Sequence, residues 1–85
     1  MSRVIVTFKV MPTGTDVDLD NLEKEIKTSV SPERIVREPV AFGLVALKVT
    51  TLVEDAGGQV DAVENKLREI EGVGSVEATE MTRAL

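Results

Sequence analysis

Cysteine, histidine, tyrosine and tryptophan are all missing from this sequence of 85 residues. Without cysteine there is no disulfide and no thiolate nucleophile, and a cytosolic location is the simplest interpretation. Without histidine the chain lacks the most adaptable general base at neutral pH and also lacks the best zinc ligands. A nucleophilic triad cannot be assembled without its base. We therefore expect a protein that is not an enzyme, that uses no side-chain acid–base or covalent chemistry, and that needs no metal or other cofactor.

Aromatic side chains and clustered positive charge are scarce as well. Phe8 and Phe42 are the only aromatic residues, and ten Lys and Arg residues are scattered among fifteen Asp and Glu, for a net charge of −5. A nucleic-acid surface needs clustered cations, and single-stranded binding also needs aromatic rings on which bases stack. The composition therefore argues against direct binding of nucleic acid. An acidic surface suits a basic protein partner, or it simply aids solubility.

Long apolar runs are absent, since none approaches the roughly 20 residues of a membrane span. The N-terminus enters an alternating strand pattern at once, so we expect no signal peptide. A chain of this length supports one modest core, and no linker or break in composition divides it. We expect a single domain over residues 1–85, cytoplasmic, without membrane contact, and monomeric when free.

Alternation with a period of two predicts the strands. Residues 3–11 form the first of them, residues 34–38 a short charged edge strand, residues 45–54 the third, and residues 73–81 the last. The inward residues of the first and third are Val4, Val6, Phe8, Val10, Val45, Leu47, Val49, Thr51 and Val53. In the last strand Val76 and Ala78 are expected to face inward, whereas Ala46 falls on the outer face of the third.

Apolar residues at helical spacing predict two amphipathic helices. The first contains Leu19, Leu22, Ile26 and Val30, and the second contains Val60, Val63, Leu67 and Ile70. Asp16 and Asp18 compete as the first N-cap, and Ser31-Pro32 ends that helix. A turn over residues 55–58 precedes the second helix, which we expect to end at Gly72. Two exposed pairs at i,i+4 spacing are expected, Glu23–Lys27 and Glu64–Arg68.

The order of elements is strand–helix–strand, repeated twice. Right-handed crossovers let the two units interleave into one four-stranded antiparallel sheet with both helices on one face. This arrangement is the α+β ferredoxin-like sandwich. The strand order 4-1-3-2 follows from that fold and is not given by the periodicity.

The connection between the second and third strands contains the most informative residue. Pro39 cannot donate to a sheet ladder and Gly43 permits a bend, so a hairpin turn is expected over residues 38–43. Phe42 is out of phase with the inward face of the strand that follows. In one interpretation it is an aromatic contact for a partner at the hairpin tip. In the other it folds back over the end of the core.

Several segments in order resemble the archaeal elongation factor 1 beta family. They are Val4-Ile-Val-Thr-Phe-Lys-Val-Met-Pro12, Asp16-Val-Asp-Leu19, Glu38-Pro-Val-Ala-Phe-Gly-Leu-Val-Ala-Leu-Lys48 and Ile70-Glu-Gly-Val73. The resemblance covers essentially the whole chain. It implies a ferredoxin-like fold and guanine nucleotide exchange on elongation factor 1 alpha, the GTPase that delivers aminoacyl-tRNA to the ribosome. GDP and GTP would be bound by that partner and not by this chain.

In eukaryotic members of the family, an aromatic residue in the loop that matches Ala41-Phe42-Gly43 contacts the GTPase. The resemblance thus implies that Phe42 docks together with Pro39, Val40, Ala41 and Gly43. A lysine beside the C-terminus of those members is implicated at the magnesium and phosphate site. That feature does not transfer, because the last lysine here is Lys66 and the nearest cation to the end is Arg83. An arginine cannot be assumed to replace a lysine, so our expectation is only that the tail around Arg83 reaches toward the nucleotide site.

A second class of function stays open on the sequence. Small domains of this topology also serve as regulatory or assembly modules that bind a small ligand or a partner protein, and fold alone does not separate the two classes.

Overall fold

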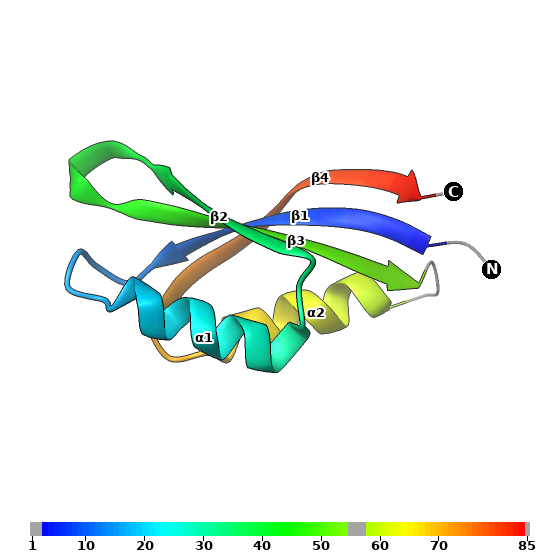
Figure 1. Ribbon diagram of the computed structural model, residues 1–85, viewed down its shortest axis with the longest axis horizontal. Helices are drawn as coiled ribbons and strands as arrows, with labels where there is room; N and C mark the ends of the chain where they lie inside the picture. Colours follow the sequence, from blue (N-terminus) through cyan, green and yellow to red (C-terminus); the bar gives the residue numbers. More distant parts are fainter. Residues whose placement is uncertain (1–2, 55–57, 85) are drawn as a thin grey trace.

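The structure is a computed structural model that describes residues 3–54 and 58–84 (Figure 1). Its elements in chain order are β1 (Arg3–Pro12), α1 (Leu19–Val30), β2 (Arg34–Pro39), a short 3₁₀ turn (Ala41–Gly43), β3 (Val45–Glu54), α2 (Gln59–Arg68) and β4 (Val73–Ala84). The predicted turn over residues 55–58 lies mostly outside the described residues, since residues 55–57 are not among them.

The four strands form one antiparallel sheet in the order β2-β3-β1-β4, which is the predicted order 4-1-3-2 seen from the other edge. Figure 1 shows both helices on the same face of this sheet, so the described residues have two layers. The predicted ferredoxin-like α+β fold is confirmed. The hairpin between β2 and β3 projects at one end of the long axis, and the end of β4 lies at the other (Figure 1).

The core lies between the sheet and the two helices. The alternation in β1 and β3 places their inward side chains there, and each helix adds its apolar stripe. The fully or nearly buried residues include Val4, Val6, Phe8, Val10, Leu22, Ile26, Leu47, Val49, Leu67 and Val76. Ala46 is also fully buried, although it lies on the outer face of β3, so that face is partly shielded at its hairpin end.

Helix α1 begins at the second of the two competing caps. The Asp18 carboxylate accepts from the backbone N–H groups of Asp20 and Asn21, at 3.1 and 3.3 Å. These are two of the donors that a helix N-terminus leaves without a helical partner. The helix ends at Val30, and its C-cap residue Ser31 takes a left-handed conformation before Pro32. Asp18, not Asp16, is therefore the N-cap.

Strand β4 contains a bulge that the sequence pattern did not reveal. Ala78 pairs with Phe8, but Glu80 pairs with Thr7, so Thr79 has no partner in the register. The Thr79 hydroxyl donates to the Thr7 carbonyl oxygen at 3.2 Å. A bulge shifts the parity of a strand, and the residues beyond it therefore face the opposite way from the expected alternation.

The predicted end of the second helix is wrong. Helix α2 ends at Arg68, and Gly72 lies instead in the turn before β4, with a φ of 97° that favours glycine. Its carbonyl oxygen accepts from the Thr13 N–H at 2.9 Å, which joins this turn to the loop after β1. No helix in the described part of the chain is long and apolar enough to cross a membrane.

Candidate functional site

The tip of the β2–β3 hairpin is a tight turn built on two left-handed residues. The Leu44 N–H donates to the Ala41 carbonyl oxygen at 3.2 Å, and the Val40 N–H donates to the Leu44 carbonyl oxygen at 2.9 Å. Phe42 and Gly43 are the central residues, with φ of 61° and 76°. Positive φ at both central positions characterises the type I′ turn, whose twist matches that of the strands it joins.

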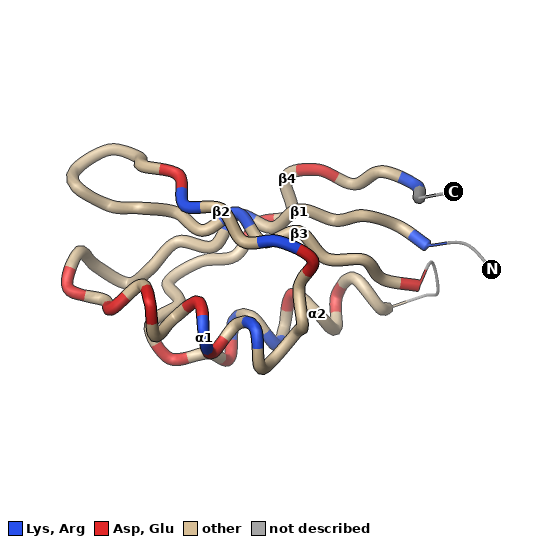
Figure 2. The backbone as a smooth tube through the Cα atoms, in the orientation of Figure 1, with Lys and Arg blue, Asp and Glu red and all other residues tan. Residues whose placement is uncertain are grey.

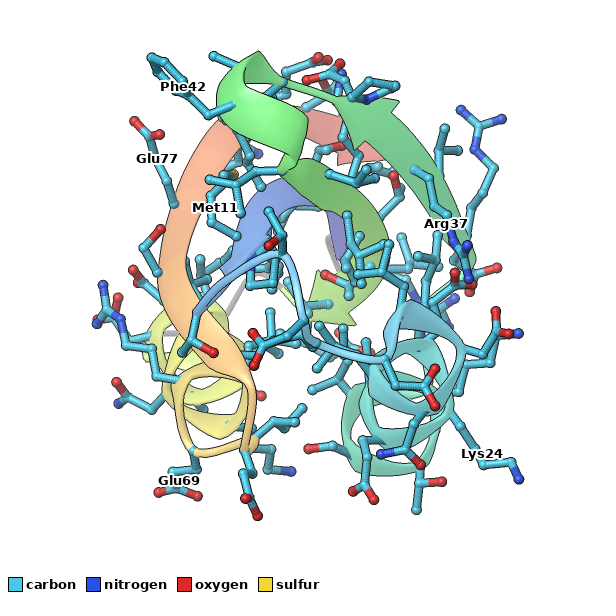
Figure 3. The ribbon with its side chains drawn as sticks, turned by 90° about the vertical axis from the view of Figure 1, so that its left-hand side faces the viewer. Met11, Lys24, Arg37, Phe42, Glu69 and Glu77 are labelled. Atoms are coloured by element: carbon cyan, nitrogen blue, oxygen red, sulfur yellow. The ribbon has the colours of Figure 1, made fainter. Side chains whose placement is uncertain are left out.

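Phe42 is 94% exposed, and Figure 3 shows its ring at the top of the hairpin, directed away from the body of the protein. The interpretation in which Phe42 folds back over the core is therefore wrong. No other large apolar side chain among the described residues approaches this exposure; the next is Met81 at 57%. An exposed aromatic ring at a tip is well placed to enter a pocket on another protein.

The backbone of Phe42 adds a second cost to that of exposing its ring. A left-handed conformation is unfavourable for a residue with a Cβ atom, by roughly 1–2 kcal/mol. The exposure is not offset within the chain, since the ring packs against almost nothing, whereas the strained backbone is held by the two hydrogen bonds of the turn. Backbone strain of this kind clusters at functional sites, and here it points to the hairpin tip.

Replacing Phe42 with glycine is therefore expected to leave the isolated protein as stable or to stabilise it by up to about 1 kcal/mol. Glycine removes the left-handed strain, and this gain is partly offset by its larger freedom in the unfolded chain. Urea unfolding followed by circular dichroism measures the change, with Phe42→Ala as the comparison that keeps the strain. A clear loss of stability in Phe42→Gly would show that the ring makes contacts that stabilise the fold.

The other expected site residues divide between the two ends of the sheet. Pro39, Val40, Ala41 and Gly43 lie with Phe42 at the hairpin. Arg83 pairs with Val4, which in turn pairs with Val53 near the far end of β3. Val53 is eight residues from Val45, which is roughly 27 Å along a strand. The structure thus groups the five hairpin residues and separates them from Arg83.

Arg83 also lies on the opposite face from the one that simple alternation predicts. Directly opposed residues in antiparallel strands share a face, and Val4 faces the helices. Arg83 is therefore on the helix side of the sheet, and its position follows from the bulge at Thr79. A single sequence contains no clear signal for that bulge.

One further side chain at the hairpin was not expected. The Arg37 guanidinium donates from Nε to Glu23 Oε2 and from Nη2 to Asp20 Oδ1, both at 2.5 Å. The hydrogen bond to Glu23, and to a smaller extent the one to Asp20, raises the pKa of Arg37 above its ordinary value, so the guanidinium stays charged. The Glu23 carboxylate, expected to pair with Lys27 along the helix, binds Arg37 instead. The expected Glu64–Arg68 pair is present at 2.7 Å.

Charge does not single out the hairpin tip. Figure 2 shows most of the acidic residues along the helices and their connecting loops, with Glu38, Glu54, Glu77 and Glu80 on strands. By contrast, six of the ten Lys and Arg residues lie on strands. The excess negative charge thus belongs mainly to the helical layer. Among residues 3–54 and 58–84 there is no group of three or more acidic side chains arranged to hold a metal ion.

The outer face of the sheet has a shallow open cavity of about 180 Å³. It is lined by Thr7, Arg34, Val36, Lys48, Thr50 and Glu80. Ligand pockets are usually larger, about 300–1,000 Å³, and are lined mainly by apolar side chains. This cavity is small and mixed in charge, so it does not have the character of a ligand pocket.

Comparison with known proteins places the whole chain in one family. The family model described as "EF-1 guanine nucleotide exchange domain" matches residues 5–84. An elongation factor 1-beta from Methanothermobacter thermautotrophicus is 47% identical, with all of both chains covered. The elongation factor 1-beta of Methanosphaerula palustris is 46% identical over 96% of this chain and 98% of its own, and that of Methanoregula boonei is 42% identical over the same shares. The chain therefore belongs to the family of EF-1 guanine nucleotide exchange domains.

Proposed function

We propose that this exchange factor promotes GDP release and GTP loading on elongation factor 1 alpha by docking its hairpin tip on the GTPase. The observation that supports the docking surface is the exposure of Phe42, whose aromatic ring is 94% exposed on a strained turn. The family match supports the choice of partner. The activity belongs in the cytoplasm, where translation elongation takes place.

Exchange of this kind requires no bond to be made or broken by the exchange factor. A protein that binds the nucleotide-free GTPase more tightly than the nucleotide-bound form must, by linkage, lower nucleotide affinity by the same factor. Coupling free energies of about 1–3 kcal/mol correspond to roughly 5- to 150-fold. Faster release also needs a lower barrier, for which disturbance of the magnesium site of the GTPase is our proposal.

The separation of the two groups of site residues implies that the partner is contacted at two places. The described residues extend 41 Å along their longest axis, with the hairpin at one end and Arg83 near the other (Figure 1). A single small pocket cannot reach both. A GTPase larger than this protein can receive Phe42 at one position while the tail around Arg83 approaches the nucleotide site at another.

The direct test follows a fluorescent GDP analogue released from purified archaeal elongation factor 1 alpha, with excess unlabelled GDP and catalytic amounts of this protein. Faster release at sub-stoichiometric concentration is expected, because each molecule acts on many GTPase molecules. If the rate of GDP release from the GTPase is unchanged by this protein, with its fold confirmed by circular dichroism, the proposed function is overturned.

Arg83 is predicted to affect the rate and not the docking. In Arg83→Ala the maximal rate of GDP release is expected to fall by about fivefold, the lower end of ordinary coupling. The half-saturating concentration of the exchange factor should change little, because the hairpin contact is intact. Arg3→Ala is the matched control, since Arg3 lies at the same end of the sheet but faces the other way. Equal maximal rates for the two variants would remove Arg83 from the mechanism.

A further inference from the structure

The hairpin projects beyond the rest of the sheet, starting at the pair formed by Arg37 and Leu47. The pairing of β1 with β3 ends at Val10 opposite Leu47, and Leu47 is also the partner of Arg37 on β2. Beyond this level the strands of the hairpin pair only with each other, through Glu38 with Ala46 and Pro39 with Val45. We call residues 38–46 the arm. A two-stranded ribbon has little stability of its own and twists readily, so its direction depends on how its base is held.

Arg37 holds the base of the arm to helix α1. Leu47 is buried on the helix side of the sheet, and Arg37, directly opposite, faces the same way. Figure 3 shows the Arg37 side chain extending from β2 toward α1. Its planar guanidinium contacts Asp20 and Glu23, which are three residues apart on one face of the helix. Two charge-assisted hydrogen bonds to separate carboxylates fix both the position and the orientation of the group.

We propose that Arg37 is a positioning residue for docking on the GTPase. The bridge from Arg37 to Asp20 and Glu23 sets the angle at which the arm leaves the sheet, and thereby the place at which Phe42 is presented. This inference rests on the proposed function, and it concerns how the docking residue is held before the partner arrives. Preorganisation of a binding segment improves affinity because less conformational freedom is lost on binding.

The tip of the arm approaches the same part of the molecule. A Cβ atom on Gly43 would lie 3.7 Å from the Thr15 methyl group, in the loop between β1 and α1. That loop leads directly to the Asp18 cap and to Asp20. The arm is therefore oriented on α1 at its base and lies close to the loop before α1 at its tip.

Because the bridge lies at the surface, its effect on the position of the arm can be tested apart from its effect on folding stability. The side chains of Arg37 and Asp20 are 44% and 90% exposed, and that of Glu23 is 21% exposed, as is that of Glu64 in the control pair. Exposed ion pairs add little to folding free energy, so loss of the bridge should leave the protein folded. What it should change is the fraction of molecules whose arm is directed for docking, and the apparent dissociation constant rises as that fraction falls.

The test compares Arg37→Met with Arg68→Met, a control that removes the same charge and another exposed pair, Arg68–Glu64. In the protein alone, the ¹⁵N heteronuclear NOE of the amides of residues 41–44 should fall in Arg37→Met and stay unchanged in Arg68→Met. In the GDP-release assay, Arg37→Met should raise the half-saturating concentration about three- to fivefold at unchanged maximal rate. Arg68→Met should behave as the parent protein does.

A charge exchange supplies the rescue. Arg37→Glu places a third carboxylate beside Asp20 and Glu23 and should give the larger increase in half-saturating concentration. Combining it with Glu23→Arg restores one ion pair and should recover most of the loss. If each substitution acted only by disturbing the fold, the increases in half-saturating concentration of the two single variants would add in the double variant and would not cancel.

The outcomes distinguish this inference from the proposed function. If the parent protein does not accelerate GDP release, the proposed function fails, while the NOE comparison still tests whether Arg37 holds the arm. Unchanged NOE values in Arg37→Met overturn the positioning role whatever the assay gives. Lower NOE values with an unchanged half-saturating concentration also overturn it, because the arm would then be loosened without consequence for docking.

Discussion

Replacing Phe42 with alanine is expected to reduce the efficiency of GDP release by at least about 30-fold while leaving the protein folded. The ring has almost no contacts to lose in the free protein, because 94% of the residue is exposed. On docking, a Phe side chain buries on the order of 200 Å². At about 25 cal/mol per Å² this gives an upper limit of roughly 5 kcal/mol, and interface anchors commonly contribute about 2 kcal/mol or more.

The measurement is the half-saturating concentration and maximal rate of GDP release for Phe42→Ala, with circular dichroism and urea unfolding as the check on folding. Leu52→Ala is the matched control, since Leu52 is an exposed large apolar residue that lies on β3 away from the arm and on the opposite face of the sheet from Arg83. It should retain nearly full activity. Activity of Phe42→Ala equal to that of the control would remove Phe42 from the docking surface.

Much of the fold could be predicted because it depends on local patterns. The alternation from Val4 to Val10 and the helical stripe that includes Leu22 and Ile26 are set by covalent geometry, and the structure buries these residues as expected. Asp18 could be named as a candidate cap for the same reason. The strand order needed knowledge of the fold, since no local pattern specifies which strands pair.

The features that could not be predicted depend on contacts between distant parts of the chain. The bulge at Thr79 arises from the pairing of β4 with β1, and it alone decides which way Arg83 faces. The bridge from Arg37 to Glu23 joins residues that are 14 positions apart. A helix pair at i,i+4 was the local alternative for Glu23, and the tertiary contact replaced it.

The hairpin tip was predicted in part. Gly43 and Pro39 indicated a turn, and Phe42 stood out because it was out of phase with the strand. Its left-handed conformation could not be expected, since an aromatic residue is uncommon there. Both exposure and strain became visible only in the structure, and together they favour one of the two interpretations that the sequence had left open.

Replacement of the other phenylalanine, Phe8, should destabilise the fold and leave docking unaffected, the reverse of what is expected for Phe42. Phe8 is fully buried and pairs with Val49 on β3 and Ala78 on β4. Phe8→Ala leaves a cavity at the centre of the sheet and is expected to lower the free energy of unfolding by about 3–5 kcal/mol. For 85 residues the total is on the order of 4–13 kcal/mol, so the loss is a large share of it. Urea unfolding followed by circular dichroism measures the change.

Because Phe8 is fully buried in the core, its replacement should act on GDP release only through the folded fraction. At low temperature, and after correction for that fraction, Phe8→Ala should promote GDP release from the GTPase as efficiently as the parent protein does. Phe8→Leu keeps most of the buried volume and is the milder control for variants that fail to fold. A loss of activity in folded Phe8→Leu would show that core packing beneath the sheet is coupled to the arm. Retention of activity would show that the two phenylalanines have different roles. Phe8 stabilises the sheet from which Arg37 orients the arm, and Phe42 makes the contact with the GTPase.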